Sequence, residues 1–137
     1  MADFVSAIER SKRMSLIRKK NTKPELLVRR LVHALGYRFR LHRSDLPGTP
    51  DIVLPRHRKV IDVRGCFWHS HSCRKAKPAV ASHTAYWHPK LIRNVQRDRQ
   101  NARRLRTAGW RVLTVWECET RDPAKLEMKL ARFLGGN

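Results

Sequence analysis

The nine-residue segment from Gly65 to Cys73 constrains this chain most, because it holds two cysteines, two histidines and two adjacent aromatic residues. A closed structural zinc site takes four Cys or His ligands in a tetrahedron. With the one cysteine outside the segment, the chain supplies such a set in Cys66, His71, Cys73 and Cys118. On spacing alone, His69 could replace His71 as the fourth ligand. The segment therefore predicts a structural zinc site with one histidine left for another role.

The whole chain is strongly basic. Its 137 residues include 31 Lys and Arg against 11 Asp and Glu, a net charge of +20 that is spread along the sequence and not confined to one tail. Such a distribution is typical of a folded protein that binds a polyanion. An acidic membrane surface is the competing partner, but the sequence lacks the run of about 18 apolar residues that could span a bilayer. We therefore expect nucleic acid as the partner and no membrane.

Length and cysteine usage indicate a single domain in a reducing compartment. The chain is near the commonest domain size, and three cysteines without a secretory signal are typical of metal ligands and not of disulfides. The alternative is three buried free thiols. Residues 1–21 are basic and somewhat amphipathic, like an organelle transit peptide, but Asp3 and Glu9 count against that interpretation. We expect a DNA-contacting arm over 1–21 and one folded domain over 22–137.

The hydrophobic pattern predicts helix, three strands, helix, strand, helix. A helix is expected from Thr22 to Leu35, with Glu25 in a capping box. Strands are expected at 37–41, 51–54 and 60–63, followed by a long loop at 74–89. A second helix is expected at 90–108, with Leu91, Ile92, Val95, Ala102 and Leu105 inward. A strand at 110–116, with Trp110 and Trp116 in the core, and a helix from Asp122 to Leu134 complete the expected elements. This order predicts an α/β fold, a mixed sheet flanked by helices in which the strand ends near Asp51, Gly65 and Cys118 converge.

Two carboxylates lie near the ends of neighbouring predicted strands. Pro50-Asp51 and Asp62-Val63-Arg64 are similar to the paired acidic signature of restriction-type nucleases, with Arg64 in place of the usual lysine. Carboxylate oxygens at such a position can hold Mg²⁺ for phosphodiester cleavage. The plainer alternatives are a turn residue for Asp51 and a salt bridge to an arginine for Asp62.

Further candidates for chemistry are two histidines, one acidic residue and three aromatic residues. His69 or His71, whichever does not bind zinc, can move a proton near neutral pH. Asp98 can orient an imidazole, or can simply pair with Arg99 or Arg103 on its own helix. Phe67, Trp68 and Trp87 lie in segments poor in core residues, and apolar side chains of this kind can wedge between base pairs. Core packing is an equal alternative for Trp68.

Four motifs together closely resemble the very short patch repair (Vsr) endonucleases. They are Gly65-Cys-Phe-Trp-His69, Pro47-Gly-Thr-Pro-Asp51, Asn94-Val-Gln-Arg-Asp98 and the segment Gly109–Cys118. The resemblance extends from about Ser11 to Cys118. It implies a restriction-endonuclease-like fold and a bacterial, cytoplasmic, nucleoid-associated monomer. The implied activity is nicking of one strand of double-stranded DNA 5′ to the thymine of a T:G mismatch that arises from 5-methylcytosine deamination, with mismatch-repair proteins and a DNA polymerase acting downstream.

The resemblance also implies roles for individual residues. Asp51 and the main-chain carbonyl of Val63 would hold catalytic Mg²⁺, His69 would be the general acid and base, Asp98 would support it, and Glu25 would join the water and metal network. Structural Zn²⁺ would then be bound by Cys66, His71, Cys73 and Cys118. Contacts to DNA would be made by Met14, Phe67, Trp68 and Trp87.

This chain departs from the best-known relative at Asp62-Val63-Arg64, where that relative carries a Thr-His pair. Asp62 could therefore join the metal site and Arg64 could hold the scissile phosphate. The departure keeps open a restriction-type or transposon-associated nuclease that cuts matched DNA. Besides the mismatch nickase and the nuclease for matched DNA, a third interpretation is a zinc-stabilised DNA-binding module without activity.

Overall fold

The computed structural model describes residues 21–66 and 84–136. In these ranges the elements are α2 (Lys23–Ala34), β1 (Arg40–Leu41), β2 (Ile52–Leu54), β3 (Lys59–Arg64), α4 (Thr84–Thr107), β4 (Arg111–Trp116), the 3₁₀-helix η1 (Glu117–Arg121) and α5 (Pro123–Gly135). Apart from the short η1, this is the predicted order of helices and strands. The predicted arm falls on residues 1–20, which lie outside the described part of the chain, and on Asn21, its last residue.

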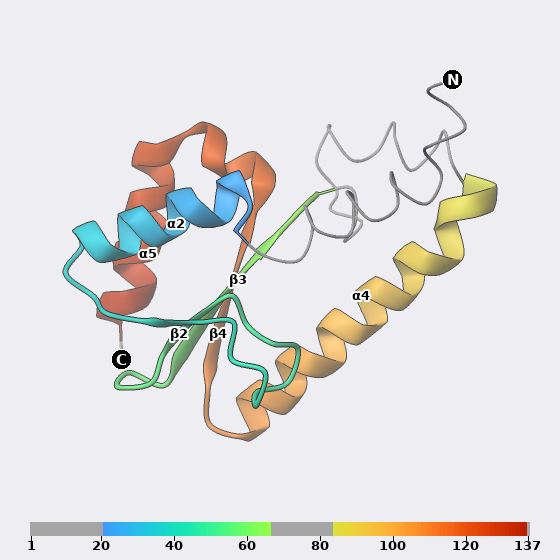
Figure 1. Ribbon diagram of the computed structural model, residues 1–137, viewed down its shortest axis with the longest axis horizontal. Helices are drawn as coiled ribbons and strands as arrows, with labels where there is room; N and C mark the ends of the chain where they lie inside the picture. Colours follow the sequence, from blue (N-terminus) through green and yellow to red (C-terminus); the bar gives the residue numbers. More distant parts are fainter. Residues whose placement is uncertain (1–20, 67–83, 137) are drawn as a thin grey trace.

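The strands form one mixed sheet in the order β1-β2-β3-β4. β1 and β3 both run antiparallel to β2, whereas β3 and β4 are parallel along six residue pairs from Lys59↔Arg111 to Arg64↔Trp116. The parallel pair is joined by α4, as a parallel connection requires a crossover. The predicted mixed sheet flanked by helices is confirmed (Figure 1).

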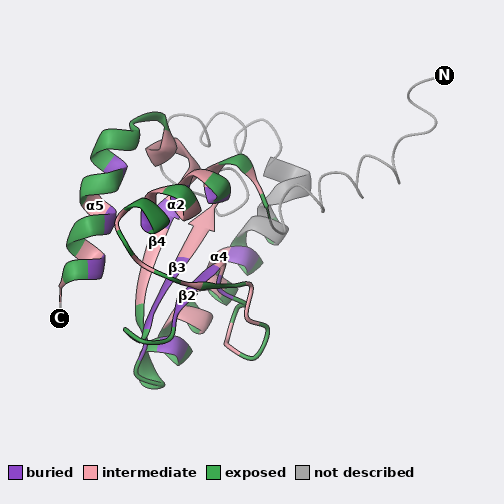
Figure 2. Ribbon diagram, turned by 60° about the vertical axis from the view of Figure 1, so that its left-hand side comes forward, coloured by how far each residue is buried: buried purple, intermediate pink, exposed green. Residues whose placement is uncertain are grey.

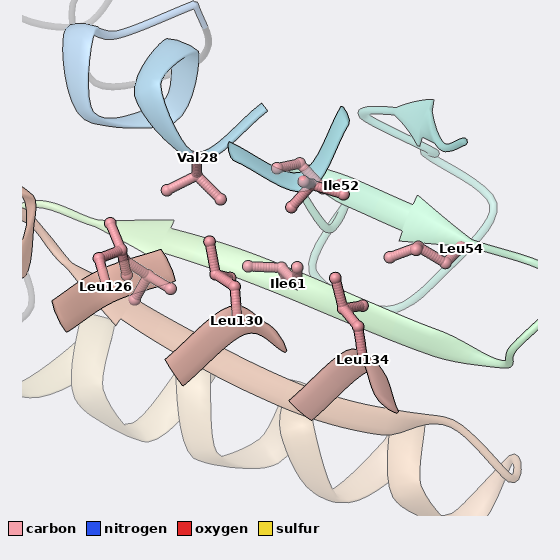
Figure 3. Packing of buried hydrophobic residues seen from close by; sticks show 9 residues of the cluster. Val28, Ile52, Leu54, Ile61, Leu126, Leu130 and Leu134 are labelled. Atoms are coloured by element: carbon pink, nitrogen blue, oxygen red, sulfur yellow. The ribbon is translucent and has the colours of Figure 1, made fainter. Parts of the chain in front are cut away.

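Helices cover both faces of the sheet. On one face, α2 and α5 pack over a core of fully or nearly fully buried side chains: Val28, Val32, Ile52, Leu54, Ile61, Val115, Leu126, Leu130 and Leu134. Figure 3 shows the three leucines of α5 directed at the sheet beside Ile61. On the other face, α4 packs through Leu105 against Val53, Val60 and Trp110. β3 changes from buried to half-buried toward its C-terminal end (Figure 2), and that half-buried end carries Asp62 and Arg64.

Local sequence explains where the two outer helices begin. The Thr22 hydroxyl accepts the backbone N–H of Glu25, with Pro24 in the first turn, and Gly36 follows the helix with a positive φ of 95°. Asp122 caps α5 by accepting the N–H of Lys125. These starts agree with the sequence predictions. Glu25 was expected to turn its carboxylate back to the start of α2 as part of a capping box. The carboxylate instead contacts Arg29 and His42.

Lys59, at the start of β3, fastens the end of α5 to the sheet. Its side chain is only 4% exposed, and its Nζ donates to the main-chain oxygens of Phe133 at 2.8 Å, Leu134 at 3.0 Å and Gly136. The last carbonyls of a helix have no partner within the helix, so the ammonium group satisfies acceptors that would otherwise be buried without a donor. Burial lowers the pKa of Lys59, and the nearby Arg111 lowers it further.

The outer edge of β4 is occupied by two side chains. Glu119 accepts the backbone N–H of Trp116 at 2.9 Å, and Lys129 donates to the carbonyl of Thr114 at 3.4 Å. The two side chains also form an ion pair at 2.7 Å. At the opposite edge, β1 has only two residues.

Four predictions of local structure are wrong. Residues 84–89, expected in a loop, form the first turns of α4, and Pro89 lies inside the helix, where it removes one i→i−4 hydrogen bond and its ring crowds the carbonyl four residues earlier. Ile92, expected inward, is 41% exposed. The strand expected at 37–41 is reduced to Arg40–Leu41, because β2 offers few partners and Tyr37 and Phe39 instead pack on the α2/α5 core. Trp110 is buried as expected, whereas Trp116 is only half-buried.

Among the described residues, no helix combines the length and the apolar character needed to cross a membrane.

Candidate active site

The two carboxylates predicted at the strand ends lie together. Asp51 immediately precedes β2 and Asp62 belongs to β3, and continuing the Ile52↔Ile61 pairing by one residue sets Asp51 opposite Asp62. The backbone N–H of Val63 donates to Asp51 Oδ2 at 2.7 Å. Gly48 makes the approach to Asp51 possible: its φ is +76°, and a Cβ there would lie 2.9 Å from Asn101 Nδ2 on α4.

Glu25 reaches the same place from α2. Its side chain is 2% exposed, and Glu25 Oε2 lies 2.9 Å from His42 Nε2 and also accepts from Arg29. His42 follows β1 in a left-handed conformation with φ 48°, and its backbone N–H donates to the carbonyl of Asp51 at 3.1 Å. His42 thus touches Glu25 with its ring and Asp51 with its main chain.

Glu25, His42 and Asp51 form a three-donor cluster. One ligand atom from each lies within 4.8 Å of the other two. Two carboxylate oxygens and an imidazole nitrogen are donors that divalent cations accept. The arrangement can therefore hold a cation at the end of the sheet where Asp62 and Arg64 also lie.

The electrostatics of the site favour added positive charge. Burial raises the pKa of Asp51 to about 8, and the neighbouring Asp62 and Glu25 carboxylates raise it as well, against the opposing effects of the Val63 N–H and Arg64. Burial also raises the pKa of Asp62, with Arg64 opposing. A bound cation would relieve this carboxylate repulsion and displace the proton from Asp51.

Arg64 connects the sheet to α4. Its guanidinium lies 3.5 Å from Asp62 Oδ2 and 3.7 Å from Asp98 Oδ2. Asp98 is therefore paired across the fold, and not with Arg99 or Arg103 as the plainer alternative held. The salt bridge that was the alternative for Asp62 is present, at the limit of hydrogen-bonding distance. The three side chains are 14–18% exposed, so solvent reaches each of them.

Two of the four predicted zinc ligands lie at equivalent positions beyond neighbouring strands. Arg64 pairs with Trp116, so Cys66 and Cys118 each follow their half of that pair by two residues. Cys66 is buried, Cys118 is half-buried, and neither forms a disulfide. The other two, His71 and Cys73, lie outside the described residues, as do Met14, Phe67, Trp68 and His69. Trp87 belongs to α4, but its side chain is not among those described.

Sequence reasoning missed His42 and Arg29. A single histidine after a short alternating segment has no spacing signature, and it becomes notable only because the β1–β2 pairing sets it beside Asp51. Arg29 stands four residues after Glu25 on α2, a spacing at which oppositely charged helix residues meet, and that signal was available.

The chain is similar to known proteins in sequence as well as in fold. The family described as "DNA mismatch endonuclease Vsr" matches residues 2–75. The "Type II nicking enzyme V.XorIIP" of Xanthomonas oryzae pv. oryzae is 49% identical over 98% of this chain and 98% of its own length. The "DNA mismatch endonuclease Vsr" of Escherichia coli is 43% identical over 92% of this chain and 80% of its own.

A solved structure shares the fold. The catalytic domain of the homing endonuclease I-Bth0305I superimposes with a TM-score of 0.56, covering 82% of this chain and 94% of that domain at 20% identity. The likeness identifies an α/β nuclease fold for the helices and sheet described above.

Proposed function

The chain belongs to the Vsr family of DNA mismatch endonucleases, and on that premise we propose that it nicks one strand of duplex DNA 5′ to the thymine of a T:G mismatch. Such a mismatch arises when 5-methylcytosine deaminates. The observation that carries the proposal is the convergence of Glu25, His42 and Asp51 within 4.8 Å of one another, beside Asp62 and Arg64, in a chain of net charge +20.

The donor set fits a divalent cation, which we take to be Mg²⁺. Asp51 would hold it together with the main-chain carbonyl of Val63. In a strand, the N–H and C=O of one residue point to the same side, and the Val63 N–H already faces Asp51, so the carbonyl has the required direction. When bound, the ion supplies a positive charge that polarises the phosphate and acidifies water. Glu25, oriented by His42 and Arg29, would position the attacking water.

The remaining roles belong to residues around this cluster. His69 would move the proton as general acid and base. Asp98, which already orients Arg64, would support the catalytic side chains from α4. Arg64 would hold the scissile phosphate, because a guanidinium presents several donors to phosphate oxygens, and Asp62 would orient it or contribute an oxygen to the metal.

We further propose a structural Zn²⁺ ion bound by Cys66, His71, Cys73 and Cys118. The equivalent positions of Cys66 and Cys118 beyond β3 and β4 support this set, because two thiolates from adjacent strand ends can share one tetrahedral ion. The ion would stabilise the segment that carries His69. Residues 22–137 would then form a single nuclease domain.

DNA contacts would come from the arm and the metal-bound segment. Met14, within the arm of residues 1–21, would insert from one groove, and Phe67, Trp68 and Trp87 from the other, because apolar side chains pressed into a duplex unstack and bend it. The protein would act as a monomer in the bacterial cytoplasm, on the nucleoid, with mismatch-repair proteins and a DNA polymerase completing the repair.

The test uses two duplexes that are identical except for T:G or C:G at one position, each with and without added Mg²⁺. A chelator is avoided because it would also remove zinc. We expect Mg²⁺-dependent nicking of the T:G duplex alone, on the thymine strand. Equal cleavage of both duplexes would replace the repair function by that of a nuclease for matched DNA.

Two substitutions separate the alternatives within the site. Asp51→Ala should abolish nicking and keep DNA binding, whereas a wild-type protein that binds without cutting would support the DNA-binding module. Asp62→Ala should slow nicking and weaken its Mg²⁺ dependence. If the Asp62→Ala variant keeps the wild-type rate and Mg²⁺ dependence, Asp62 has no catalytic part.

A further inference from the structure

The exposed side of α4 carries more positive charge than the exposed sides of α2 and α5. Over the described residues 92–107 it presents six arginines, Arg93, Arg97, Arg99, Arg103, Arg104 and Arg106, with two glutamines and one threonine among them. The one acidic residue of this stretch, Asp98, is half-buried and paired with Arg64. By contrast, α5 exposes Glu127 and Met128 among its cations. Apart from Ile92, the exposed side of α4 therefore offers hydrogen-bond donors throughout and no exposed carboxylate.

The arginines near the C-terminal end of α4 are held by no partner within residues 21–66 and 84–136. Arg99, Arg103 and Arg106 follow one another at spacings of four and three residues, so they share one stripe of the helix. In the described ranges, none of the three side chains forms an ion pair or donates a hydrogen bond. Like charges at such spacings repel one another. A stripe of this kind costs stability unless an anion covers it.

The stripe faces away from the candidate active site. α4 packs on the sheet through Leu105, and Asp98 directs its carboxylate to Arg64 on β3, so the arginine stripe lies on the side of the helix that the sheet does not cover. Among the described helices, α4 lies on one side of the sheet, opposite α2 and α5 (Figure 1). Glu25, the buried carboxylate of the site, comes from α2 on the other face. Asp98, which borders the site from α4, lies on the sheet-facing side of the helix, so a duplex engaged at Asp51, Asp62 and Arg64 would not lie along the stripe on the opposite side.

We propose that the exposed face of α4 is a second nucleic-acid-binding surface, which binds the phosphate backbone of a duplex segment other than the one held in the active site. The stretch from Arg93 to Arg106 is about 20 Å long at about 1.5 Å per helical residue. Phosphates of one strand recur about every 3.4 Å along a duplex, so the face can follow roughly six of them. Its arginine and glutamine donors carry no base-specific arrangement, so it binds without regard to sequence.

The inference rests on the proposed function only for the choice of DNA as the polyanion. A protein with a cutting surface and a separate holding surface can remain attached to one duplex segment while it examines another. The predicted signature is therefore bridging of two duplexes, a property that the active site alone does not provide.

The test compares the wild type with Arg99→Gln/Arg103→Gln/Arg106→Gln and with a control, Arg30→Gln/Lys125→Gln/Arg132→Gln. The control residues are exposed on α2 and α5, and both variants lose three positive charges. Binding of a fully matched duplex is measured against salt concentration without added Mg²⁺. Bridging is measured by capture of a fluorescent duplex on an immobilised one, and nicking of the T:G duplex is measured under single-turnover conditions.

We expect the α4 variant to lose bridging and to show a salt dependence shallower by about 2–3 in log–log slope, about 0.9 for each phosphate that is no longer neutralised. Its single-turnover nicking rate at saturating DNA should equal that of the wild type. The control should keep bridging and most of the slope. An equal reduction in both triple variants, or a wild type that does not bridge, would overturn the proposal. Failure of the proposed function would instead appear as absent or unselective nicking in all three proteins.

Discussion

We predict that the negative charge of Asp51, which the proposed metal site needs, lowers the free energy of unfolding. The substitution Asp51→Asn tests this prediction. The carboxyl group is held in a half-buried position beside Asp62 and Glu25, and this environment raises its pKa to about 8 from an ordinary value of 3.8, with loss of solvation as the largest cause. Asparagine is nearly isosteric, does not ionise, and can still accept the N–H of Val63. The substitution therefore removes the charge and keeps the shape.

The direction of the pKa change determines how the free energy of unfolding depends on pH. Because the folded state binds the Asp51 proton more tightly than the unfolded state, the free energy of unfolding falls as pH rises from about 4 to about 8. A difference of about 4 between the two pKa values corresponds to a ceiling of roughly 5–6 kcal/mol at about 1.4 kcal/mol each. Relaxation and water penetration reduce such values, so we expect Asp51→Asn to be more stable than wild type by about 2–5 kcal/mol at pH 8. At pH 4 the gain should be under about 1 kcal/mol.

The assay is urea unfolding followed by tryptophan fluorescence at pH 4 and pH 8, with no divalent ion added. The same variant should lack nicking activity. Asp45→Asn is the control, because Asp45 is an exposed carboxylate whose pKa is lowered by its hydrogen bond from Arg43, so its substitution should bring no gain at pH 8. A stability difference for Asp51→Asn that is the same at both pH values would refute the reasoning.

Three further predictions concern the surroundings of the site. Lys59→Met removes all three hydrogen bonds from Nζ to the end of α5 and should lower the free energy of unfolding by about 2–3 kcal/mol; an unchanged urea midpoint would contradict it. His42→Ala leaves Glu25 without its imidazole partner and should slow single-turnover nicking by about 10-fold, whereas a wild-type rate would exclude a positioning role. Cys118→Ser should reduce bound zinc, measured by atomic absorption, from one ion per chain to a substoichiometric amount and lower the thermal midpoint; one full zinc retained would remove Cys118 from the ligand set.

Elements set by local chemistry were predictable from the sequence. Thr22 with Pro24, and Asp122 with Pro123, combine a capping side chain with a proline in the first turn, and both helices start there. The spacing of Leu126, Leu130 and Leu134 is enough to place one face of α5 in the core. The sequence prediction starts α4 too late because proline is disfavoured inside a helix and so resembles a helix boundary, whereas α4 contains Pro89 beyond its first turn.

The candidate site was predictable only in its carboxylates. Asp51 and Asp62 follow from a recognisable acidic pair, but their partners depend on long-range packing. From its spacing alone Glu25 is a capping residue, and only the family resemblance gave it a part in the site, because its contact with His42 requires α2 to lie over the end of β1. Likewise, Asp98 meets Arg64 only because α4 crosses back along the sheet. No local sequence pattern predicts the contact of Glu25 with His42 or that of Asp98 with Arg64.

The ion pair of Glu119 and Lys129 occupies the place that a fifth strand would take. An unpaired strand edge is a template for another chain, and edge-to-edge pairing leads to aggregation. Here Glu119 occupies the Trp116 N–H, and Lys129 the Thr114 carbonyl. The other edge offers only the two residues of β1. Copies of a basic protein that bind the same DNA would meet at high local concentration. Because both edges of the sheet offer few unpaired backbone groups, the sheets of neighbouring copies have little opportunity to pair edge to edge.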